Sequence, residues 1–470
     1  MKSAAQRARI ERGDWQTPRT LAREVMDVVA TTSPPPASVL EPTCGVGALL
    51  HAAAEFFPRS QLFGFDVAEA HLEAARAALT HTAATFVCAD FFNVDWDDVV
   101  AKLPQPILVL GNPPWVTNAA VGALNGTNLP AKSNFKGDRG LEARTGRGNF
   151  DVSEWMLLRL LRALQGTHFT LAMLCKAGVA RQVLLQSTGM KVAGALYEID
   201  ARVHFDATVD AVLLVLRSKE RVQTVWPVYP SLTAAAPTRT LGMHDNALVN
   251  DVMLAKETAF LEGPSDLTWR SGLKHDCSAV MEWTQATGGW QNGLGEVVPL
   301  WDEGHLYPLC KGSHVAAGRG PNHRVLVTQT KLGQNTRELE QAAPHTWSYL
   351  QRHASRFAAR KSRIYNGQPP FAMFGVGDYC FANFKVAICG LYKRLAFHVV
   401  GPHDGRPVMF DDTCYFLPCT SLEQAQSLTQ ALNGDLAQRF LRARLFVDSK
   451  RPVTKALLAR LSLPRLLSHS

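Results

Sequence analysis

The sequence predicts an α/β protein in two parts: a doubly wound, mostly parallel sheet covered by helices, followed by a smaller α+β domain. Two observations lead to this fold class. In the first ~220 residues, short apolar runs alternate with segments of helical pattern, as in βα units. Further along the chain, several short apolar runs with turn residues are interrupted by only two helical segments.

The elements of the first part follow one another at the spacing of βα units in a Rossmann-like sheet. The expected strands are the apolar runs 39–40, 61–65, 85–88, 106–110, 169–175 and 209–216. The expected helices are 48–57, 68–80 and 150–164. In the second part we expect strands at 325–327, 371–374 and 386–388, and helices near 346–360 and 421–434.

Two stretches lack clear periodicity, and they suggest where the domains divide. Residues 116–148 are rich in Asn, Gly, Lys and Arg, whereas residues 230–270 have a mixed composition. We therefore expect a catalytic domain at 1–230, a connecting region at 231–270 and a second domain at 271–470.

The composition excludes several classes of protein. Hydrophobic residues make up 46% and charged residues 19% of the 470 positions, an ordinary globular balance. No run of ~18 apolar residues predicts a membrane span, and the N-terminus lacks the apolar stretch of a secretory signal. Nine cysteines without a CxxC pair indicate a reduced, cytoplasmic compartment and predict no metal site.

The net charge of +8 is unevenly distributed. Residues 301–470 contain 22 Lys and Arg against 11 Asp and Glu, whereas residues 1–300 contain 27 against 30. A near-neutral first part and a basic second part suggest a catalytic part joined to a part that binds a polyanion such as nucleic acid. A soluble surface with excess arginine is the simpler alternative.

Polar features at the ends of the first three strands predict a nucleoside pocket, because ligands of open α/β sheets bind at the carboxyl ends of the strands. Gly45 and Gly47 let the backbone turn tightly and approach a ligand. Neither a third glycine nor a Gly-Lys-Ser/Thr follows, which disfavours NAD and ATP. Asp66 can accept hydrogen bonds from ribose hydroxyls, Asp90 can accept from an exocyclic amine, and the ring of Phe91 can lie on the base.

A fourth feature, Asn112-Pro113-Pro114-Trp115, predicts the catalytic loop. The two prolines stiffen the backbone and have no N–H, so their carbonyls remain directed acceptors. The Asn112 amide adds another acceptor, and Trp115 offers a flat stacking face. Such a loop suits a planar group whose amine is to be alkylated. The two acceptors would hold the amine hydrogens and direct the nitrogen lone pair towards an electrophile.

These motifs resemble those of the S-adenosylmethionine-dependent amino-methyltransferases of DNA, and more narrowly the gamma group of adenine-N6 enzymes. Residues 13–120 carry the resemblance, with Gln16 and Trp115 at positions where the family usually has Tyr and Tyr or Phe. It implies S-adenosylmethionine as the cofactor and a flipped-out adenine as the substrate. The residues implied for the cofactor are Thr17, Pro18, Glu41, Cys44, Gly45, Gly47, Asp66, Asp90 and Phe91, and those for catalysis are Asn112, Pro113, Pro114, Trp115 and, stacking on the flipped base, Phe205.

The resemblance also implies contacts to double-stranded DNA, with the C-terminal domain as the target-recognition domain. The segment 306–313 resembles the motif at the start of such domains, and Arg352, Arg356 and Arg360 are spaced by four, as on one helical face. The expected DNA-binding residues are Lys132, Lys136, Arg139, Arg144, Arg147, Lys311, Arg352, Arg356, Arg360, Lys361 and Arg363. A disordered insertion and a solvated basic helix are the alternatives.

Several readings of function stay open at this level. Enzymes with Asn-Pro-Pro-aromatic also methylate RNA guanine or a protein glutamine amide, cytosine-N4 enzymes present the same geometry, and a DNA-binding protein with a decayed pocket needs no catalysis. The basic second domain favours DNA. We expect a cytoplasmic modification enzyme, monomeric when acting and without a membrane association, whose restriction endonuclease, where one exists, is encoded separately.

Overall fold

The computed structural model describes residues 15–469 except for 81, 117–150, 288 and 298–302. The chain divides into two compact units, Met1–Val252 and Met253–Ser470, called the first and second unit below. No helix in the described ranges is long and apolar enough to cross a membrane.

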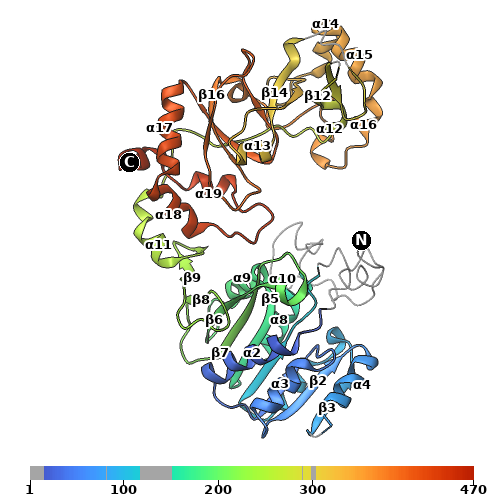
Figure 1. The fold of residues 1–470 in the computed structure, drawn as a ribbon, viewed down its shortest axis with the longest axis vertical. Coiled ribbons are helices and arrows are strands. Elements are labelled where there is room, and N and C mark those ends of the chain that lie inside the picture. Colours follow the sequence, from blue (N-terminus) through green and yellow to red (C-terminus); the bar gives the residue numbers. More distant parts are fainter. Residues whose placement is uncertain (1–14, 81, 117–150, 288, 298–302, 470) are drawn as a thin grey trace. The chain divides into compact units, whose positions relative to one another are not determined.

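The first unit is built on one ten-stranded sheet (Figure 1). Its strands, in their order across the sheet, are β10 (Ala247–Val249), β9 (Arg239–His244), β8 (Val225–Tyr229), β6 (Val192–Ile199), β7 (Ala211–Ser218), β5 (Phe169–Lys176), β4 (Ile107–Gly111), β1 (Ser38–Glu41), β2 (Gln61–Asp66) and β3 (Ala84–Cys88). Strands β1 and β4 are buried along their whole length, as expected for apolar strands covered on both faces.

The strand directions place one set of strand ends together. Strands β3, β2, β1, β4 and β5 are parallel neighbours, so their carboxyl ends lie at one edge of the sheet. Strand β7 runs antiparallel to both β5 and β6. The doubly wound α/β fold expected from the sequence is confirmed, and the sheet is mixed beyond β5.

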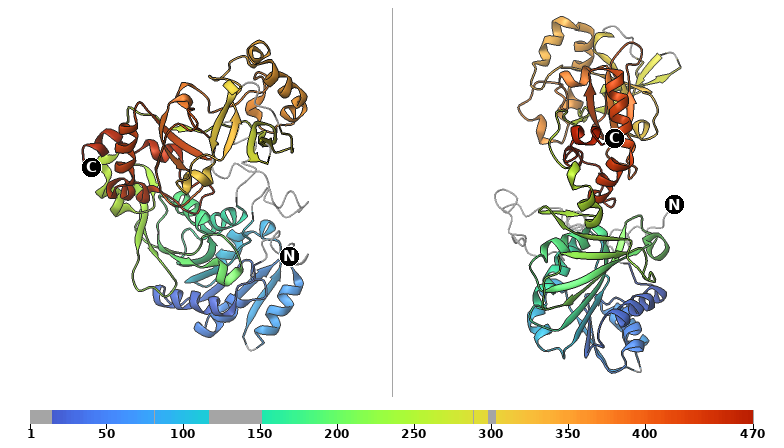
Figure 2. Two further views of the ribbon diagram at one scale, coloured as in Figure 1. Left: turned by 45° about the horizontal axis from the view of Figure 1, so that its top comes forward. Right: turned by 90° about the vertical axis from the view of Figure 1, so that its left-hand side faces the viewer.

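Helices cover both faces of this sheet, as Figure 2 shows. They are α2 (Arg19–Thr32), α3 (Ala48–Phe56), α4 (Glu69–Ala78), α5 (Trp96–Ala101), α8 (Val152–Ala163), α9 (Ala177–Gln186) and α10 (Ala201–Phe205). Helix α2 buries residues such as Leu21, Val25 and Val29 in a core shared with α3 and with Leu108 and Leu110 of β4. This layer supports the carboxyl-terminal edge of β1 and β4.

The sheet continues into the range 231–270, which the sequence suggests as the connecting region. Strands β9 and β10 of the sheet fall within this range, and the division between the two units comes after Val252. Strand β9 is not an apolar run, because Arg239 and Thr240 start it and His244 ends it, and only Leu241 and Gly242 in it are buried.

The second unit is an α+β domain, as expected. It holds a four-stranded sheet of β11 (Arg270–Ser271), β19 (Cys414–Cys419), β16 (Phe384–Cys389) and β17 (His398–Val400). A five-stranded sheet contains β13 (Gly289–Asn292), β12 (Glu282–Ala286), β15 (His323–Leu326), β14 (Leu306–Cys310) and β18 (Met409–Phe410). The helices are α11 (Val252–Glu257), which crosses the division, α12 (Ser278–Met281), α13 (Gly312–Ala316), α14 (Leu339–Ala342), α15 (Pro344–Arg352), α16 (Ala354–Ala358), α17 (Leu422–Asn433), α18 (Asp435–Arg444), α19 (Lys455–Ala459) and α20 (Leu463–Leu467).

Two expectations for the second unit are wrong. The stretch 371–374 is not a strand, because Phe371 has a left-handed backbone (φ 60°) and only Phe374 forms an isolated bridge, with Lys274. The expected helix at 346–360 is two helices, α15 and α16, which are separated at His353 (φ −105°, ψ 13°). The helical phase is lost there, so residues on either side do not share one continuous helical face.

Candidate functional site

The polar residues expected at the strand ends are brought together by the sheet. Glu41 ends β1, which lies between β2 and β4; Asp66 ends β2, and Asn112 directly follows β4. Asp90 follows β3, the next strand beyond β2. The four side chains therefore come from adjacent strands at the same edge.

The glycine-rich loop between β1 and α3 is pinned to the end of β2. Gly45 (φ 52°) donates its N–H to Asp66 Oδ2 at 2.9 Å, and the neighbouring Cys44 donates to the carbonyl of Phe65 at 2.8 Å. Gly47 (φ 80°) is the N-cap of α3, and a Cβ atom there would lie 2.9 Å from the Cβ of Ala75. Both positive φ angles and the close packing favour glycine at these two positions.

Glu41 is a buried carboxyl group with an unsatisfied oxygen. Glu41 is only 3% exposed, and its Oε2 has no hydrogen-bond partner. Burial raises the pKa of Glu41 well above its ordinary range, and the charge of Asp66 raises it further, against a lowering by the backbone N–H of Leu50. An unsatisfied buried carboxyl group is costly, so this arrangement suits a cationic or hydrogen-bond-donating ligand.

The carboxylates of Asp66 and Asp90 both make local hydrogen bonds. Asp66 Oδ1 accepts the N–H of Ala68 at 2.9 Å and lies 3.2 Å from His71 Nδ1. Asp90 caps the short 3-10 helix that follows it by accepting the N–H of Phe92 at 3.0 Å. A carboxylate has about four acceptor positions, so contacts to a nucleoside would use those that remain.

Asn112 is held in one orientation by the segment before α2. Its Nδ2 donates to the carbonyl oxygen of Trp15 at 2.8 Å and to Thr17 Oγ1 at 3.3 Å. Because a carbonyl can only accept, this pairing assigns the nitrogen to the Trp15 side of the amide. The amide oxygen, Oδ1, is buried and has no hydrogen-bond partner. Asn112 Oδ1 is therefore an acceptor that no group in the described part of the chain uses.

The aromatic residues expected at the substrate pocket pack against one another. Trp115 and Phe205 are buried, and their rings meet edge to face with centroids 5.1 Å apart. Phe205 also lies 6.4 Å from the ring of Trp15. Rings in edge-to-face contact leave no slot between them, so Phe205 and Trp115 do not frame a base in this conformation.

Phe91 is not exposed as a stacking platform either. It is 6% exposed, and its ring lies 4.7 Å from that of Trp96, whose Nε1 donates to the Phe91 carbonyl. The residue therefore anchors the turn after β3. Of the other expected residues, Pro113 is buried, Pro114 is half-buried, and Pro18 immediately precedes α2.

Comparison with known proteins gives the family. No family model matches the chain. It is 39% identical over 469 residues to the type II methyltransferase M.NspV of Nostoc sp., and the match covers 97% of each chain. The chain belongs to the type II methyltransferases.

One solved structure resembles this methyltransferase along most of its length. The type IIL restriction-modification enzyme MmeI, determined in complex with DNA, aligns with a TM-score of 0.56 and 12% identity. The alignment covers 94% of this chain and 64% of the MmeI chain. At that identity the likeness shows the fold, and it extends over both units of the methyltransferase.

Two of the basic residues expected to contact DNA have partners inside the second unit of the methyltransferase. Lys311 pairs with Glu282, which also lies 3.2 Å from His275 Nε2. Arg360 donates to the carbonyl oxygens of His275 and Ala372 at 3.2 and 2.6 Å. Burial raises the pKa of Glu282, but hydrogen bonds from His275 and Lys311 outweigh it and lower that pKa overall.

The other basic residues expected to contact DNA are either exposed or outside the described part of the chain. Arg352, Arg356, Lys361 and Arg363 are exposed. Because α15 ends at Arg352 and α16 at Ala358, the expected single face of three arginines is wrong. Lys132, Lys136, Arg139, Arg144 and Arg147 lie outside the described residues.

The structure adds residues that the sequence did not indicate. Lys176 ends β5 at the same edge as Asn112, and its Nζ lies 2.6 Å from Asp151 Oδ2. Asp151 caps α8, and the next residue, Val152, donates its N–H to the carbonyl of Val116 at 2.9 Å. The ion pair joins the start of α8 to the end of β5, and the hydrogen bond of Val152 places that start beside Val116. Its two members are 25 positions apart in the sequence, and neither belongs to a motif that could have revealed it.

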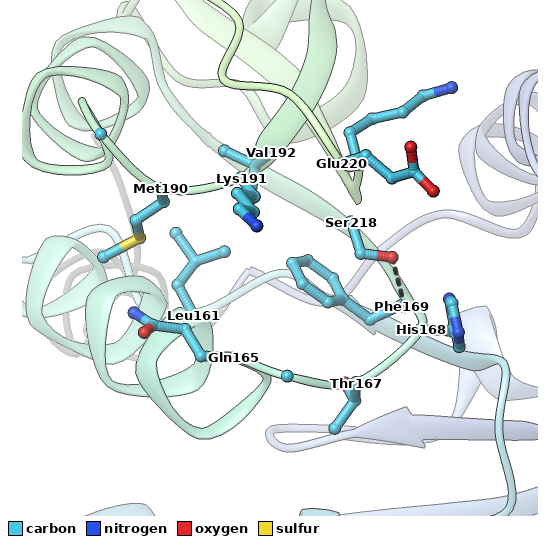
Figure 3. A pocket seen from close by; sticks show the side chains of 13 residues that line it. Leu161, Gln165, Thr167, His168, Phe169, Met190, Lys191, Val192, Ser218 and Glu220 are labelled. Carbon is cyan, nitrogen blue, oxygen red and sulfur yellow. Dashed lines mark hydrogen bonds between the residues drawn. The ribbon is translucent and has the colours of Figure 1, made fainter.

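A cavity of about 630 Å³ lies at the opposite edge of the same sheet (Figure 3). Phe169, Val192 and Ser218 are among its lining residues, and their register puts them at the amino-terminal end of β5. Figure 3 also shows the hydrogen bond from the Phe169 N–H to Ser218 Oγ. The predicted site residues that the structure describes do not line this cavity. Within the same described ranges, no cluster of three or more His, Cys, Asp or Glu could hold a metal ion.

The free energy of unfolding of this methyltransferase should fall as the pH rises above the ordinary range of glutamate pKa values. A raised pKa in the folded state means that the native protein holds the Glu41 proton more tightly than the unfolded chain. This stabilisation is complete below the unfolded pKa and is lost as the pH rises through the folded pKa. Urea unfolding of the wild type and of Glu41→Gln across this range should show a stability difference that grows with pH in favour of the variant. A constant difference would contradict the raised pKa.

Proposed function

We propose that this methyltransferase transfers a methyl group from S-adenosylmethionine to the exocyclic N6 amine of an adenine in double-stranded DNA at a specific sequence. The observation that carries the proposal is the buried, unpartnered Oδ1 of Asn112. It is an acceptor without a donor at the end of β4, and the neighbouring strand β1 ends in Glu41, which has a second unsatisfied oxygen.

The residues at the strand ends fit S-adenosylmethionine. Its methionine portion has a cationic ammonium group, which would satisfy the buried carboxyl of Glu41. The loop at Gly45 and Gly47 lets the backbone approach the same portion, and Asp66 and Asp90 would accept from the ribose and the adenine with their remaining lone pairs. When bound, the cofactor supplies an electrophilic methyl group.

The catalytic loop would act by orienting the target amine. Asn112 Oδ1 and the carbonyl oxygen of Pro113 would each accept one N–H of the amine, which directs the nitrogen lone pair out of the base plane. As the new N–C bond forms, the bond between the methyl carbon and the cofactor sulfur would break, with its electron pair left on sulfur. The nitrogen would become cationic, and its proton would then be acidic enough to pass to solvent. No general base is needed before attack.

The second unit would supply the contacts that open the duplex. Its basic balance suits a phosphate backbone, and base flipping costs a few kcal/mol that such contacts offset. The likeness to MmeI, which was determined with DNA, supports a DNA substrate. A cognate endonuclease would be a separate chain.

The proposal is tested with methyl-labelled S-adenosylmethionine and three acceptors in parallel: unmethylated genomic DNA, total RNA and a protein extract. We expect label in the DNA alone, in the wild type but not in protein inactivated by heat. Label that enters only RNA or protein contradicts the proposed substrate, while absence of label from all three contradicts the enzymatic activity itself.

Replacing Arg352 and Arg356 together with glutamine should weaken DNA binding without affecting folding. Each lost phosphate contact lowers the slope of log affinity against log salt by about 0.9, so we expect a change of about 1 to 2. The matched control is Arg439→Gln, since Arg439 is paired with Glu257 in the same unit. An unchanged salt slope in the double variant would contradict the phosphate contacts.

Lys311→Gln should instead lower thermal stability, because it removes the cation that pairs with Glu282.

A further inference from the structure

The segment Trp15–Thr17 connects two parts of the site that are far apart in sequence. The carbonyl of Trp15 and the hydroxyl of Thr17 both accept from Asn112 Nδ2, at 2.8 and 3.3 Å. Between them, Gln16 points to the glycine-rich loop, where its Oε1 accepts the N–H of Val46 at 3.1 Å. One short segment therefore contacts both the catalytic asparagine and the loop predicted to bind the cofactor.

The contact between Gln16 and the loop is close. A Cβ atom added to Gly45 would lie 2.4 Å from Gln16 Oε1, so the side-chain amide of Gln16 occupies the space that the glycine leaves open. At the position of Gln16, the gamma group of adenine-N6 methyltransferases usually has tyrosine. An amide in this place can accept a backbone N–H, and it thereby fixes the position of the chain on either side of it.

We infer that Gln16 and Thr17 are positioning residues, which orient the amide of Asn112 for catalysis and link that orientation to the cofactor loop. The inference rests on the proposed function, in which Asn112 Oδ1 accepts from the target amine. An amide rotated by 180° would present its NH₂ to the amine, and two donors do not form a hydrogen bond.

The contacts of Asn112 determine which fraction of the molecules holds its amide in the competent orientation. With both acceptors in place, the competent orientation of Asn112 satisfies two N–H groups, and the rotated orientation would bring Oδ1 against the Trp15 carbonyl. Removing the Thr17 hydroxyl or releasing the segment from Val46 reduces this preference. The observed rate then falls in proportion to the fraction of molecules that keep the competent orientation.

The test compares Thr17→Val, Thr17→Ser and Gln16→Leu with the wild type. The matched control is Thr20→Val, which removes an exposed hydroxyl from the first turn of α2. Single-turnover methyl transfer to DNA at saturating S-adenosylmethionine measures orientation, and calorimetric titration with S-adenosylmethionine measures cofactor affinity. We expect Thr17→Val and Gln16→Leu to slow transfer measurably, by no more than about tenfold, which is the ceiling that one lost hydrogen bond sets on the fall in the competent fraction. Thr17→Ser keeps the hydroxyl and should recover most of the rate that Thr17→Val loses, whereas the control Thr20→Val should transfer at the wild-type rate.

A positioning role and a role in cofactor binding alone predict different results for Gln16→Leu. If Gln16 only lines the cofactor site, Gln16→Leu weakens S-adenosylmethionine binding but transfers at the wild-type rate once saturated, and this would overturn the inference. A wild-type rate in Thr17→Val would overturn it as well.

A double-mutant cycle separates failure of the inference from failure of the proposed function. If the wild type methylates no DNA, the proposed function fails, yet the contact between Thr17 and Asn112 can still be measured by urea unfolding of Thr17→Val, Asn112→Ala and the double variant. Destabilisation of the double variant by less than the sum of the single variants supports the contact. Additive effects contradict it.

Discussion

Replacing Asn112 with alanine should slow methyl transfer to DNA about a hundredfold to a thousandfold while S-adenosylmethionine binds with nearly unchanged affinity. Losing one preorganised hydrogen-bonding group at a reacting centre typically has an effect of this size. The Asn112 side chain contacts Trp15 and Thr17, whereas Glu41 and the glycine-rich loop retain their own contacts in the variant. Single-turnover rates and calorimetric titration with S-adenosylmethionine measure the two quantities separately.

Asn112→Asp is the informative companion to this variant. It keeps an oxygen acceptor for the amine but cannot donate to Trp15 and Thr17, so it too should be slow. If Asn112→Ala were to lose S-adenosylmethionine binding as strongly as activity, the role proposed for Asn112 would be wrong, and the residue would belong to the cofactor site instead.

Replacing Glu41 with glutamine should weaken S-adenosylmethionine binding about a hundredfold or more and stabilise the protein without cofactor. Removing one partner of a buried ion pair commonly costs about 3–5 kcal/mol, and Glu41 is the buried carboxyl without a partner for Oε2. The same substitution removes the cost of that carboxyl from the ligand-free protein. Calorimetric titration and thermal unfolding with and without S-adenosylmethionine measure both effects.

Glu73→Gln provides the control, because Glu73 is an exposed glutamate on α4 of the same unit. Glu73→Gln should change neither the affinity for S-adenosylmethionine nor the thermal stability. Unchanged cofactor affinity in Glu41→Gln would show that Glu41 is buried for reasons of structure alone, and the proposed ammonium contact would have to be abandoned.

The sequence predicts the parallel half of the sheet well because β1, β4 and β5 at its centre are buried along nearly their whole length and are apolar runs. The expected ranges of all five parallel strands lie within about two residues of those observed, although β3 at the end of the sheet is largely exposed. The antiparallel direction of β7 depends on the connection through α10, and β6 contains small and polar residues that hide it. The pattern of residues in a single strand predicts neither the direction of β7 nor the presence of β6.

The site was predictable in its strand-end residues and not in its side-chain pairing. A parallel sheet necessarily gathers Glu41, Asp66 and Asn112 at one edge, whatever the rest of the chain does. That Asn112 donates to Trp15, 97 positions earlier, depends on tertiary packing. The same holds for Lys311 and Arg360, which look like DNA contacts in sequence and have internal partners in the fold.

The most direct measurement of the central claim identifies the modified base. Unmethylated genomic DNA is incubated with S-adenosylmethionine and either the wild type or Asn112→Ala, and each sample is then sequenced by a method that detects methylated bases. We predict N6-methyladenine at a single short sequence motif with the wild type and no modification above background with the variant. N4-methylcytosine at a defined motif would contradict adenine as the substrate, and equal methylation by both proteins would contradict the catalytic role of Asn112.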